Sequence, residues 1–350
     1  MKRSAFRLAI DAANLTRDRR GMGRLTRAVL AQAFADKSIE VTLLAEKSAD
    51  ARALRLEFPL ATVRWPIAAA TSRAYDAVWF PFNGMRFASG PPSLVTIHDA
   101  FAFTEPHAGR IARFREQAPI RRAAAKATRI LTDSRWSRDE IVRVLKVARE
   151  RIDVILPSPE RYWFPAGGDI LPTPLAGRKY ALLVGVREQR KNARTALEAC
   201  ARALRGPGET LVIVGELAPQ DRARALELRL SCGEISASDE LLRALYRNAS
   251  AVLVPSYAEG FGLVAVEALA CGAPLIASNA TALPEACDGA ALLVDPHDVA
   301  AWSQAIRNLF DDAEQASDLR ARAAARFASS DRTRSGRETV ALLRALASDG

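Results

Sequence analysis

Short apolar runs alternate with helix-forming segments along almost the whole chain, and this alternation limits the fold more than any other feature of the sequence. Most runs are continuously apolar, which is typical of parallel strands buried on both faces. They lie at 6–11, 41–45, 77–80, 94–98, 129–132, 152–155, 181–185, 211–215, 251–255, 275–278 and 292–295. In the second half, helical patterns separate them near 193–204, 219–230, 239–248, 264–271 and 298–310. This order predicts an α/β fold with two doubly wound units.

A segment rich in proline and glycine lies between the two halves. Residues 156–177 hold five Pro and three Gly in 22 residues, too many for a regular helix or strand. The length of 350 residues also fits two domains at about 150 residues each. We therefore predict one domain over 1–165, a second over 166–328, and a terminal segment over 329–350 whose amphipathic stretch 339–346 needs a surface to cover.

The composition is 49% hydrophobic and 26% charged, which excludes a disordered chain. No apolar stretch reaches the 18 residues of a membrane span, and Arg7 and Asp11 interrupt the first one, so neither a span nor a signal peptide is expected. The cysteines lack a CxxC spacing and predict reduced thiols in the cytoplasm. The histidines are far apart, and no metal site is predicted. These residues are Cys200, Cys232, Cys271 and Cys287, and His98, His107 and His297.

The net charge of +10 comes from 50 basic and 40 acidic residues. Such an excess indicates acidic partners, and nucleic acid, anionic lipid and phosphorylated small molecules all qualify. A biased base composition of the genome, which favours arginine codons, can produce the same excess of basic residues. Charge alone therefore does not choose among these partners.

In open α/β sheets ligands bind beyond the carboxyl ends of the strands, so the strand-to-helix loops are where a site is expected. In the first such loop, Gly21 and Gly23 directly precede a helix predicted over 24–34. Glycines there let backbone N–H groups approach an anion at a helix N-terminus. The spacing is not GxGxxG, and a purely structural turn explains the two glycines equally well.

A second loop follows the run 181–185. Gly185 ends the strand, and Asn192 is placed to cap a helix that begins at Ala193. Three cations crowd this helix start, which is unfavourable unless an anion lies there, so a phosphate site is one interpretation and a solvated basic turn is the other. The cations are Arg187, Arg190 and Lys191.

The third loop, within 256–278, is the most informative segment. Glu259 precedes the sequence Gly260-Phe261-Gly262, whose N–H groups can be exposed, and a helix from about Leu263 carries Glu267. Both carboxylates can face one site. Acidic side chains near a helix start also stabilise the helix without any ligand, so a structural role for each Glu remains open.

The fourth candidate is His98, which ends the run 94–98 and is followed by Asp99. At the carboxyl end of a strand it either points towards a ligand or is a satisfied core residue, and the sequence does not separate these alternatives.

Taken together, these segments resemble the retaining glycosyltransferases of family 4. The most specific match is the Glu-x7-Glu pattern from Glu259 to Glu267 in EGFGLVAVEALACGAPLIAS. Further segments match in the expected order, and coverage runs from about residue 7 to residue 300. They are GMGRLTRAVL, VTIHD, ATRILTDSRWSRDEIVRVL, VGVREQRKN and RLSCGEISASDELLRALYRNASAVLVPS.

The resemblance implies a GT-B fold, in which two Rossmann-like domains face a cleft and the C-terminal helix returns to the N-terminal domain. It implies transfer of a sugar from a nucleotide-diphosphate sugar, with retention of configuration and without a metal or other cofactor. The RKN sequence after the strand is similar to mannosyltransferases, so GDP-mannose is the expected donor. The expected acceptor is a glycan or lipid diphosphate in cell-surface polysaccharide synthesis.

The resemblance also assigns roles to individual residues. The diphosphate would be gripped by Arg190 and Lys191 and approached by the Gly21–Gly23 loop. Many family members place an arginine soon after the glycine that ends the strand, where this chain has Val186 and then Arg187, so Arg187 is the alternative to Arg190. His98 would contact the sugar and the leaving group. The remaining contacts are Glu259 to the sugar, the backbone of Phe261, Gly262 and Leu263 to the phosphates, Glu267 to the ribose, and the backbone near Ile235 to the base.

The segment 109–129 is strongly basic. It carries seven Lys or Arg residues against only Glu116, together with Ile111 and Phe114. One interpretation is a surface that docks an anionic membrane or a lipid-diphosphate acceptor, which would place the protein at the inner face of the membrane. The other is a solvated helix face, since Pro119 interrupts the segment. The basic residues are Arg110, Arg113, Arg115, Arg121, Arg122, Lys126 and Arg129.

Three rival functions remain. A sugar-nucleotide epimerase on the same fold should lack the Glu259–Glu267 pattern. A nucleic-acid or anion-binding protein fits the charge, but the sequence has no RNA-binding strand signature and no zinc-finger spacing, so no nucleic-acid partner is expected. An inactive scaffold would keep its partner after substitution of Glu259 and Lys191.

Overall fold

The computed structural model describes residues 5–19, 21–65, 74–105, 109–159, 161–164, 171–328 and 331–348. His107 lies outside the described residues. The chain divides into two compact units, Met1–Ser158 with Asp331–Gly350, and Pro159–Ser330. The first division falls within the proline-rich segment 156–177. The boundaries expected from the sequence were 165/166 and 328/329.

The strands agree with the predicted runs to within a few residues, apart from the two edge strands β3 and β10. They are β1 Phe6–Asp11, β2 Ile39–Leu44, β3 Thr62–Arg64, β4 Ala77–Phe80, β5 Ser93–Thr96, β6 Arg129–Thr132, β7 Ile152–Val154, β8 Lys179–Val184, β9 Glu209–Val214, β10 Cys232–Ile235, β11 Ala251–Val254, β12 Leu275–Ser278 and β13 Leu292–Val294.

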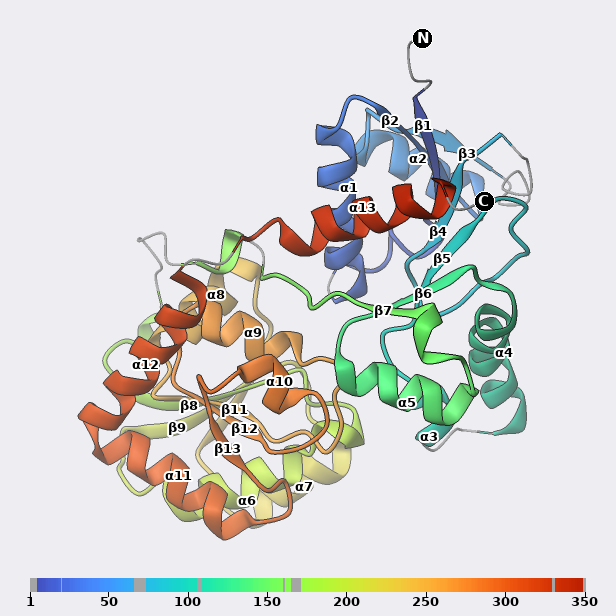
Figure 1. The fold of residues 1–350 in the computed structure, drawn as a ribbon. Helices are drawn as coiled ribbons and strands as arrows, with labels where there is room; N and C mark the ends of the chain where they lie inside the picture. Colours follow the sequence, from blue (N-terminus) through green and yellow to red (C-terminus); the bar gives the residue numbers. More distant parts are fainter. Residues whose placement is uncertain are drawn as a thin grey trace. The chain divides into compact units, whose positions relative to one another are not determined.

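The α-helices connect these strands in the α/β order that the sequence predicts (Figure 1). They are α1 Met22–Ala35, α2 Ser48–Glu57, α3 Phe101–Thr104, α4 Arg110–Lys126, α5 Arg135–Leu145, α6 Ala193–Ala203, α7 Pro219–Glu227, α8 Asp239–Asn248, α9 Leu263–Ala270, α10 Leu283–Cys287, α11 Val299–Asp311, α12 Ala313–Ala328 and α13 Arg334–Ser348.

The first unit is built on a seven-stranded sheet in the order β3-β2-β1-β4-β5-β6-β7, and neighbouring strands in it are parallel. Successive residues of β1 point to opposite faces of the sheet. Leu8 and Ile10 pack with α1, α2 and α13, whereas Ala9 packs with α4 and α5. The sheet is therefore covered by helices on both sides, as continuously apolar strands require.

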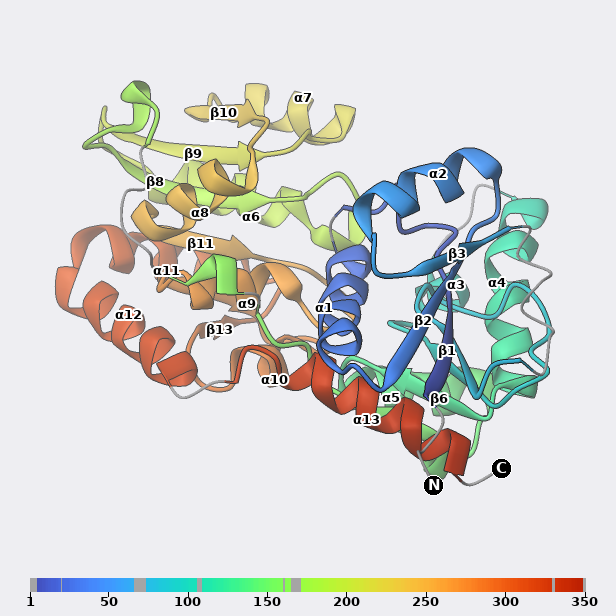
Figure 2. The same ribbon diagram turned by 90° about the horizontal axis from the view of Figure 1, so that it is seen from above.

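Helix α13 comes from the end of the chain but belongs to the first unit. Val340, Leu343 and Leu346 are buried in its core, and α13 lies beside α1 in both views (Figures 1 and 2). The two helices approach closely at Gly336, where an added Cβ would lie 2.9 Å from the carbonyl oxygen of Ala28. The amphipathic stretch 339–346 thus covers the sheet that begins the chain.

Helix α4 runs through Pro119, so the expectation that this proline interrupts the segment was wrong. Pro119 cannot donate a hydrogen bond to the preceding turn, which normally weakens a helix. Here Ile120 and Ala123 are buried against the sheet, and the carbonyl of Pro119 accepts a hydrogen bond from the Met85 N–H at 3.0 Å. Packing on this side maintains the helix across the proline.

The second unit has a six-stranded sheet in the order β10-β9-β8-β11-β12-β13, again with parallel pairings. Helices α6, α7 and α11 share one core with it, and the buried residues of α8 and α9 pack on the other face. The Tyr180 hydroxyl, for example, donates a hydrogen bond to the Leu245 carbonyl at 2.8 Å. Both sheets therefore have the Rossmann-like organisation that the sequence predicts.

Candidate functional site

The second unit brings three of the predicted site residues together. The Glu259 carboxylate lies 2.7 Å from Lys191 Nζ and 3.2 Å from Arg190 Nη1. The Ser256 hydroxyl donates to the same carboxylate at 2.7 Å. These residues come from the loops after β8 and β11, which are neighbours in the sheet. The predicted diphosphate loop and the predicted sugar-binding carboxylate thus form one cluster.

This cluster is nearly buried and is ionised. The side chain of Glu259 is only 8% exposed, and those of Lys191 and Arg190 are 16% and 18% exposed. Burial would raise the pKa of Glu259, but the positive charges of Lys191 and Arg190 outweigh it and lower this pKa. Glu259 is therefore a carboxylate at neutral pH, and in the free protein it forms ion pairs with both cations.

The start of α9 lies directly after this carboxylate. Gly262 caps the helix with φ +102°, a backbone conformation that residues with a Cβ rarely adopt, so glycine is favoured there. Among the described residues, no group accepts a hydrogen bond from the N–H groups of Phe261, Gly262 and Leu263. The Glu259 N–H is taken by the Thr281 hydroxyl at 2.9 Å. The helix start thus offers free donors beside two cations, an arrangement suited to a phosphate.

The two candidate arginines differ in position. Arg190 lies in the cluster, where it also donates to the Ala258 carbonyl at 3.1 Å. Arg187 is 81% exposed and lies 3.7 Å from Glu216, which is also exposed. Geometry therefore favours Arg190 as the arginine that would meet a diphosphate.

The other predicted contacts of this unit lie along the same edge of the sheet. Glu267 is one turn into α9 and accepts a hydrogen bond from the Tyr246 hydroxyl at 3.4 Å. Ile235 ends the edge strand β10, and its carbonyl accepts from Gly215 N–H at 3.0 Å.

In the first unit, His98 is buried and both of its ring nitrogens have partners. Nδ1 lies 2.5 Å from the Asp133 carboxylate, and Nε2 lies 2.9 Å from the Pro81 carbonyl. Burial alone would lower the pKa of His98, but the Asp133 charge and hydrogen bond, assisted by Pro81 and Asp99, raise it to about 9. His98 is thus an imidazolium at neutral pH, and a substrate can reach its nitrogens only by displacing one of these partners.

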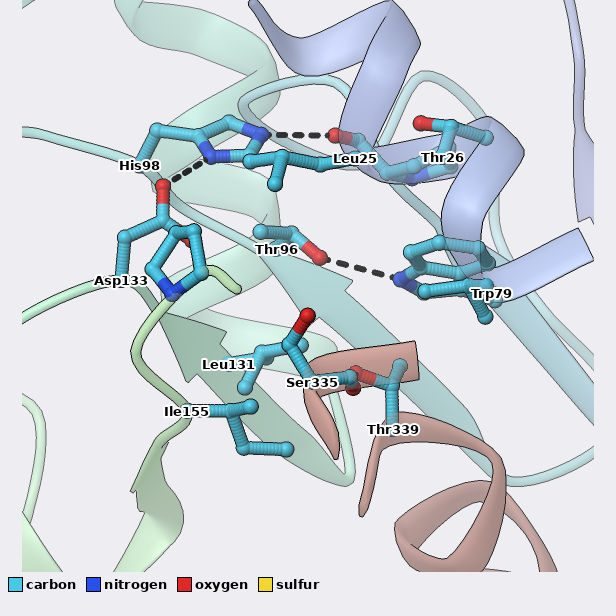
Figure 3. A pocket seen from close by; sticks show the side chains of 13 residues that line it. Leu25, Thr26, Trp79, Thr96, His98, Leu131, Asp133, Ile155, Ser335 and Thr339 are labelled. Atoms are coloured by element: carbon cyan, nitrogen blue, oxygen red, sulfur yellow. Dashed lines mark hydrogen bonds and ion pairs between the residues drawn. The ribbon is translucent and has the colours of Figure 1, made fainter. Parts of the chain in front are cut away.

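Figure 3 shows His98 and Asp133 pointing towards each other at the wall of a narrow cavity in the first unit. The cavity holds about 30 Å³, room for one or two water molecules. Thr26 of α1 and Thr339 of α13 also line it, and Trp79 donates to the Thr96 hydroxyl at 3.0 Å. The first unit thus keeps a small polar cavity beside the histidine.

The glycine loop before α1 has a structural purpose of its own. Helix α1 begins at Met22, so Gly23 lies inside it rather than before it as predicted, and Gly21 has φ +53° at the cap. A Cβ added to Gly23 would lie 2.0 Å from the Asp18 carbonyl oxygen. The Gly23 N–H donates a hydrogen bond to the Asp18 carboxylate at 3.1 Å. Arg27 fixes the loop by donating to the carbonyls of Asp18 and Leu15 at 2.8 and 2.7 Å.

Sequence reasoning missed Asp133, Ser256 and Thr281. Asp133 follows β6 directly, just as His98 follows the neighbouring strand β5 by two residues. That shared edge was a usable signal, because carboxyl ends of adjacent parallel strands bring their following residues together. Ser256 and Thr281 gave no such signal, since their hydroxyls take part in the site only by hydrogen bonding to Glu259.

We expect the stability of the first unit to fall as pH rises through the range from about 6.5 to about 9. The folded pKa of His98 lies above its unfolded value of 6.5, so the stabilisation is complete below 6.5 and is lost on passing 9. A shift of this size corresponds to about 3 kcal/mol.

Urea unfolding at several pH values across this range measures how the free energy of unfolding depends on pH. Asp133→Asn should abolish the pH slope, whereas Asp153→Asn, which breaks the Arg129–Asp153 pair, should keep it. An unchanged slope in Asp133→Asn would contradict the assignment.

Comparison with known proteins agrees with this fold. The model for glycosyl transferases group 1 matches residues 173–326, and the model for glycosyltransferase family 4 matches residues 20–157. The two matches are consecutive and together cover most of both units. The chain is thus a two-domain protein of the GT-B type. It belongs to the family 4 glycosyltransferases.

Curated relatives are similar over part of their length. The O-antigen chain mannosyltransferase B of Escherichia coli is 34% identical over 239 residues, which are 63% of this chain and 62% of that protein. The D-inositol 3-phosphate glycosyltransferase of Mycolicibacterium smegmatis is 33% identical over 202 residues, 53% of this chain and 46% of that protein. The chain therefore spans between about half and three fifths of these relatives.

Solved structures share the fold across both units. Sucrose-phosphate synthase from Thermosynechococcus elongatus superposes with a TM-score of 0.74 at 20% identity, over 99% of this chain and all of that one. HepE from Anabaena, solved in complex with UDP, gives a TM-score of 0.73 at 16% identity, over 97% of this chain and all of that one. At such identities the likeness is one of fold.

The part of the chain that the structure describes lacks two further features. In that part of the chain no helix is both long and apolar enough to cross a membrane. The same residues contain no group of three or more His, Cys, Asp or Glu side chains placed to hold a metal ion.

Proposed function

We propose that this protein transfers a sugar from a nucleoside-diphosphate sugar to a glycan or lipid-linked acceptor in polysaccharide synthesis, with retention of configuration. The observation that carries the proposal is the cluster of Lys191, Arg190 and Glu259 beside the free N–H groups at the start of α9. An anion-binding scaffold has no need of a buried carboxylate between two cations, and an epimerase on this fold is expected to lack the Glu259–Glu267 pattern.

The cluster provides what departure of a nucleoside diphosphate requires. Breaking the bond to the sugar leaves negative charge on the phosphate oxygens, and fixed cations and helix N–H groups stabilise that charge without rearranging. Lys191 and Arg190 take the diphosphate together with the N–H groups of Phe261, Gly262 and Leu263. These groups supply the charge stabilisation that a metal ion provides in other enzymes, so the proposed reaction needs no metal.

Glu259 is then released to the sugar. Its carboxylate holds the hydroxyl groups of the transferred ring, and the departing phosphate accepts the proton of the acceptor on the same face. Glu267 binds the ribose, and the backbone near Ile235 meets the base. The roles that the sequence predicts for the Gly21–Gly23 loop and for His98, which belong to the first unit, stay predictions.

The proposed donor is GDP-mannose. The name of the Escherichia coli relative supports a mannosyl donor and an acceptor in polysaccharide assembly, whereas other relatives bear different names, including the glycogen synthase of Mycobacterium tuberculosis. The base and sugar are therefore the first quantities to measure.

The test is a thermal-shift panel of GDP-, UDP- and ADP-linked sugars, each with and without EDTA. A ligand at about 100 times its Kd stabilises a protein by about 2.7 kcal/mol, which is easily measured. Stabilisation by one nucleotide sugar, unaffected by EDTA, supports the donor site and identifies the base, and a transfer assay with the same donor then reports the anomeric configuration. Stabilisation that disappears with EDTA would contradict the metal-free site.

We also propose that α4 docks the protein on an anionic membrane, where a lipid-diphosphate acceptor would lie. Its first turns expose Ile111 and Phe114, at 73% and 72%, among Arg110, Arg113 and Arg115. All five side chains lie on the first two turns of one helix. Apolar side chains among cations are typical of helices that lie in the membrane interface.

Ile111→Asp with Phe114→Asp is expected to abolish co-sedimentation with anionic vesicles. The double change replaces the apolar contacts with like charges to the lipid, and each Lys or Arg near the surface contributes about 1 kcal/mol at low salt. Sedimentation is compared at two salt concentrations and with neutral vesicles. Leu226→Asp is the matched control, since Leu226 is 76% exposed on α7 of the other unit. Equal binding by the double variant would refute this docking surface.

A further inference from the structure

The buried side chain of Asn192 connects three loops of the second unit. Its Nδ2 donates to the carbonyl of Pro255 and to the carbonyl of Pro296, both at 2.9 Å, and its Oδ1 accepts from Thr195 N–H at 3.4 Å. The residue is 3% exposed. Pro255 follows β11 and Pro296 follows β13, while Asn192 itself belongs to the loop after β8. One amide therefore joins three loops at the carboxyl edge of the sheet.

Helix capping alone does not account for this residue. Ser, Thr or Asp would cap α6 equally well through an oxygen acceptor. Only the amide adds two N–H donors, and both are used on carbonyls more than sixty residues away in sequence. The backbone of Asn192 is also left-handed, with φ +53°, a conformation that Asn tolerates better than most residues. The position thus requires the donors, the acceptor and the conformation together.

The connected loops carry the two halves of the charged cluster. Arg190 and Lys191 directly precede Asn192, and Glu259 lies in the loop that begins at Pro255. A second connection joins the same loops, because Tyr257 N–H donates to the Arg190 carbonyl at 2.8 Å. The distance between the cations and the carboxylate therefore depends on how these loops are held.

We propose that Asn192 is a positioning residue, which fixes the loops after β8, β11 and β13 so that the Glu259 carboxylate meets the sugar of a donor whose diphosphate is bound by Lys191 and Arg190. This inference rests on the proposed glycosyl transfer. It assigns Asn192 no contact with the substrate.

Asn192→Asp is the sharpest test. The change keeps volume, left-handed conformation and cap acceptor, but it turns two donors into an oxygen facing two carbonyl oxygens. We expect kcat/KM for the nucleotide sugar to fall by about 10- to 100-fold, the usual effect of losing a group that orients a binding residue. The Kd of the free nucleoside diphosphate is compared in Asn192→Gly, which removes both donors without adding an anion beside the cations, and there it should change little. The loss should shrink as pH is lowered from about 8 to about 6, where the introduced carboxyl becomes protonated and donates again.

Two further variants separate positioning from stability. Thr195→Val removes only the hydroxyl bond to the Pro296 carbonyl, 3.1 Å long, and should give a smaller loss in the same direction. Ile306→Val lowers core stability in α11 of the same unit and should leave kcat/KM unchanged. If Asn192→Asp fails to fold, Asn192→Gly, which keeps the left-handed conformation without any charge, takes its place.

The outcomes distinguish this inference from the function on which it rests. If the wild-type protein binds no nucleotide sugar and shows no transfer, the proposed function is overturned and the inference with it. If the wild-type protein is active and Asn192→Asp keeps its kcat/KM, only the positioning role is overturned. In Asn192→Gly, an equal loss in kcat/KM and in nucleoside-diphosphate affinity would also overturn it, because that pattern indicates general damage to the phosphate site.

Discussion

Lys191→Ala is expected to lose the thermal stabilisation by nucleotide sugar and to lower kcat/KM by about 10²- to 10³-fold. Lys191 Nζ is the closest cation to Glu259, at 2.7 Å, and it is the charge that would move to the departing diphosphate. Removing one donor aimed at developing negative charge typically costs this much. Titration with the donor identified in the panel, followed by steady-state kinetics, measures both effects.

Lys179→Ala is the matched control for this prediction. Lys179 lies in the same unit, where its Nζ donates to the Phe310 carbonyl at 2.5 Å, remote from the cluster. Its loss should lower stability without changing donor affinity. If Lys191→Ala retained wild-type affinity and turnover, the phosphate site would have to be placed elsewhere.

Glu259→Gln is expected to abolish transfer and, at the same time, to tighten binding of the free nucleoside diphosphate by about tenfold. In the free protein Glu259 neutralises two cations that a diphosphate needs. Gln is isosteric but uncharged, so the phosphates no longer compete with an internal anion at about 3 Å, where even a well-screened charge pair amounts to more than 1 kcal/mol. Transfer fails because the carboxylate that holds the sugar is gone.

Calorimetric titration with GDP, UDP and ADP measures the gain, and a transfer assay measures the loss. Glu209→Gln is the matched control, because Glu209 pairs with Arg307 at 2.9 Å in the same unit and its pKa is also lowered, chiefly by that hydrogen bond, to about 2. It should alter neither quantity. Weaker nucleoside-diphosphate binding by Glu259→Gln would show that the carboxylate assists the phosphate site rather than competing with it.

The fold was largely predictable because buried parallel strands carry a continuous apolar signal. Runs such as 77–80 and 251–255 became β4 and β11 almost unchanged. The two missed strands lie at sheet edges. β3 is only three residues long, and β10 exposes Gly233 and Glu234, so neither shows an apolar run. Edge strands are half solvated, and their pairing depends on the neighbouring strand more than on their own sequence.

The site was predictable in its members but not in their contacts. Glycines and charged residues at strand ends indicated Lys191 and Glu259, because anion binding needs those residue types at those places. The ion pair between Lys191 and Glu259 could not be predicted from the sequence, because it depends on β8 lying next to β11. The bonds from Asn192 to two proline carbonyls depend on the strand order as well. His98 showed the same limit, because its partner Asp133 comes from the adjacent strand.

The last helix of the chain has a consequence for biosynthesis. Because Val340, Leu343 and Leu346 of α13 complete the core of the first unit, the second unit is in effect an insertion within the first. Domains usually fold in order as they leave the ribosome. Here the second unit can finish first, while the sheet that begins the chain waits for its final helix with part of its apolar surface uncovered. During that interval the exposed apolar surface favours aggregation of the nascent protein.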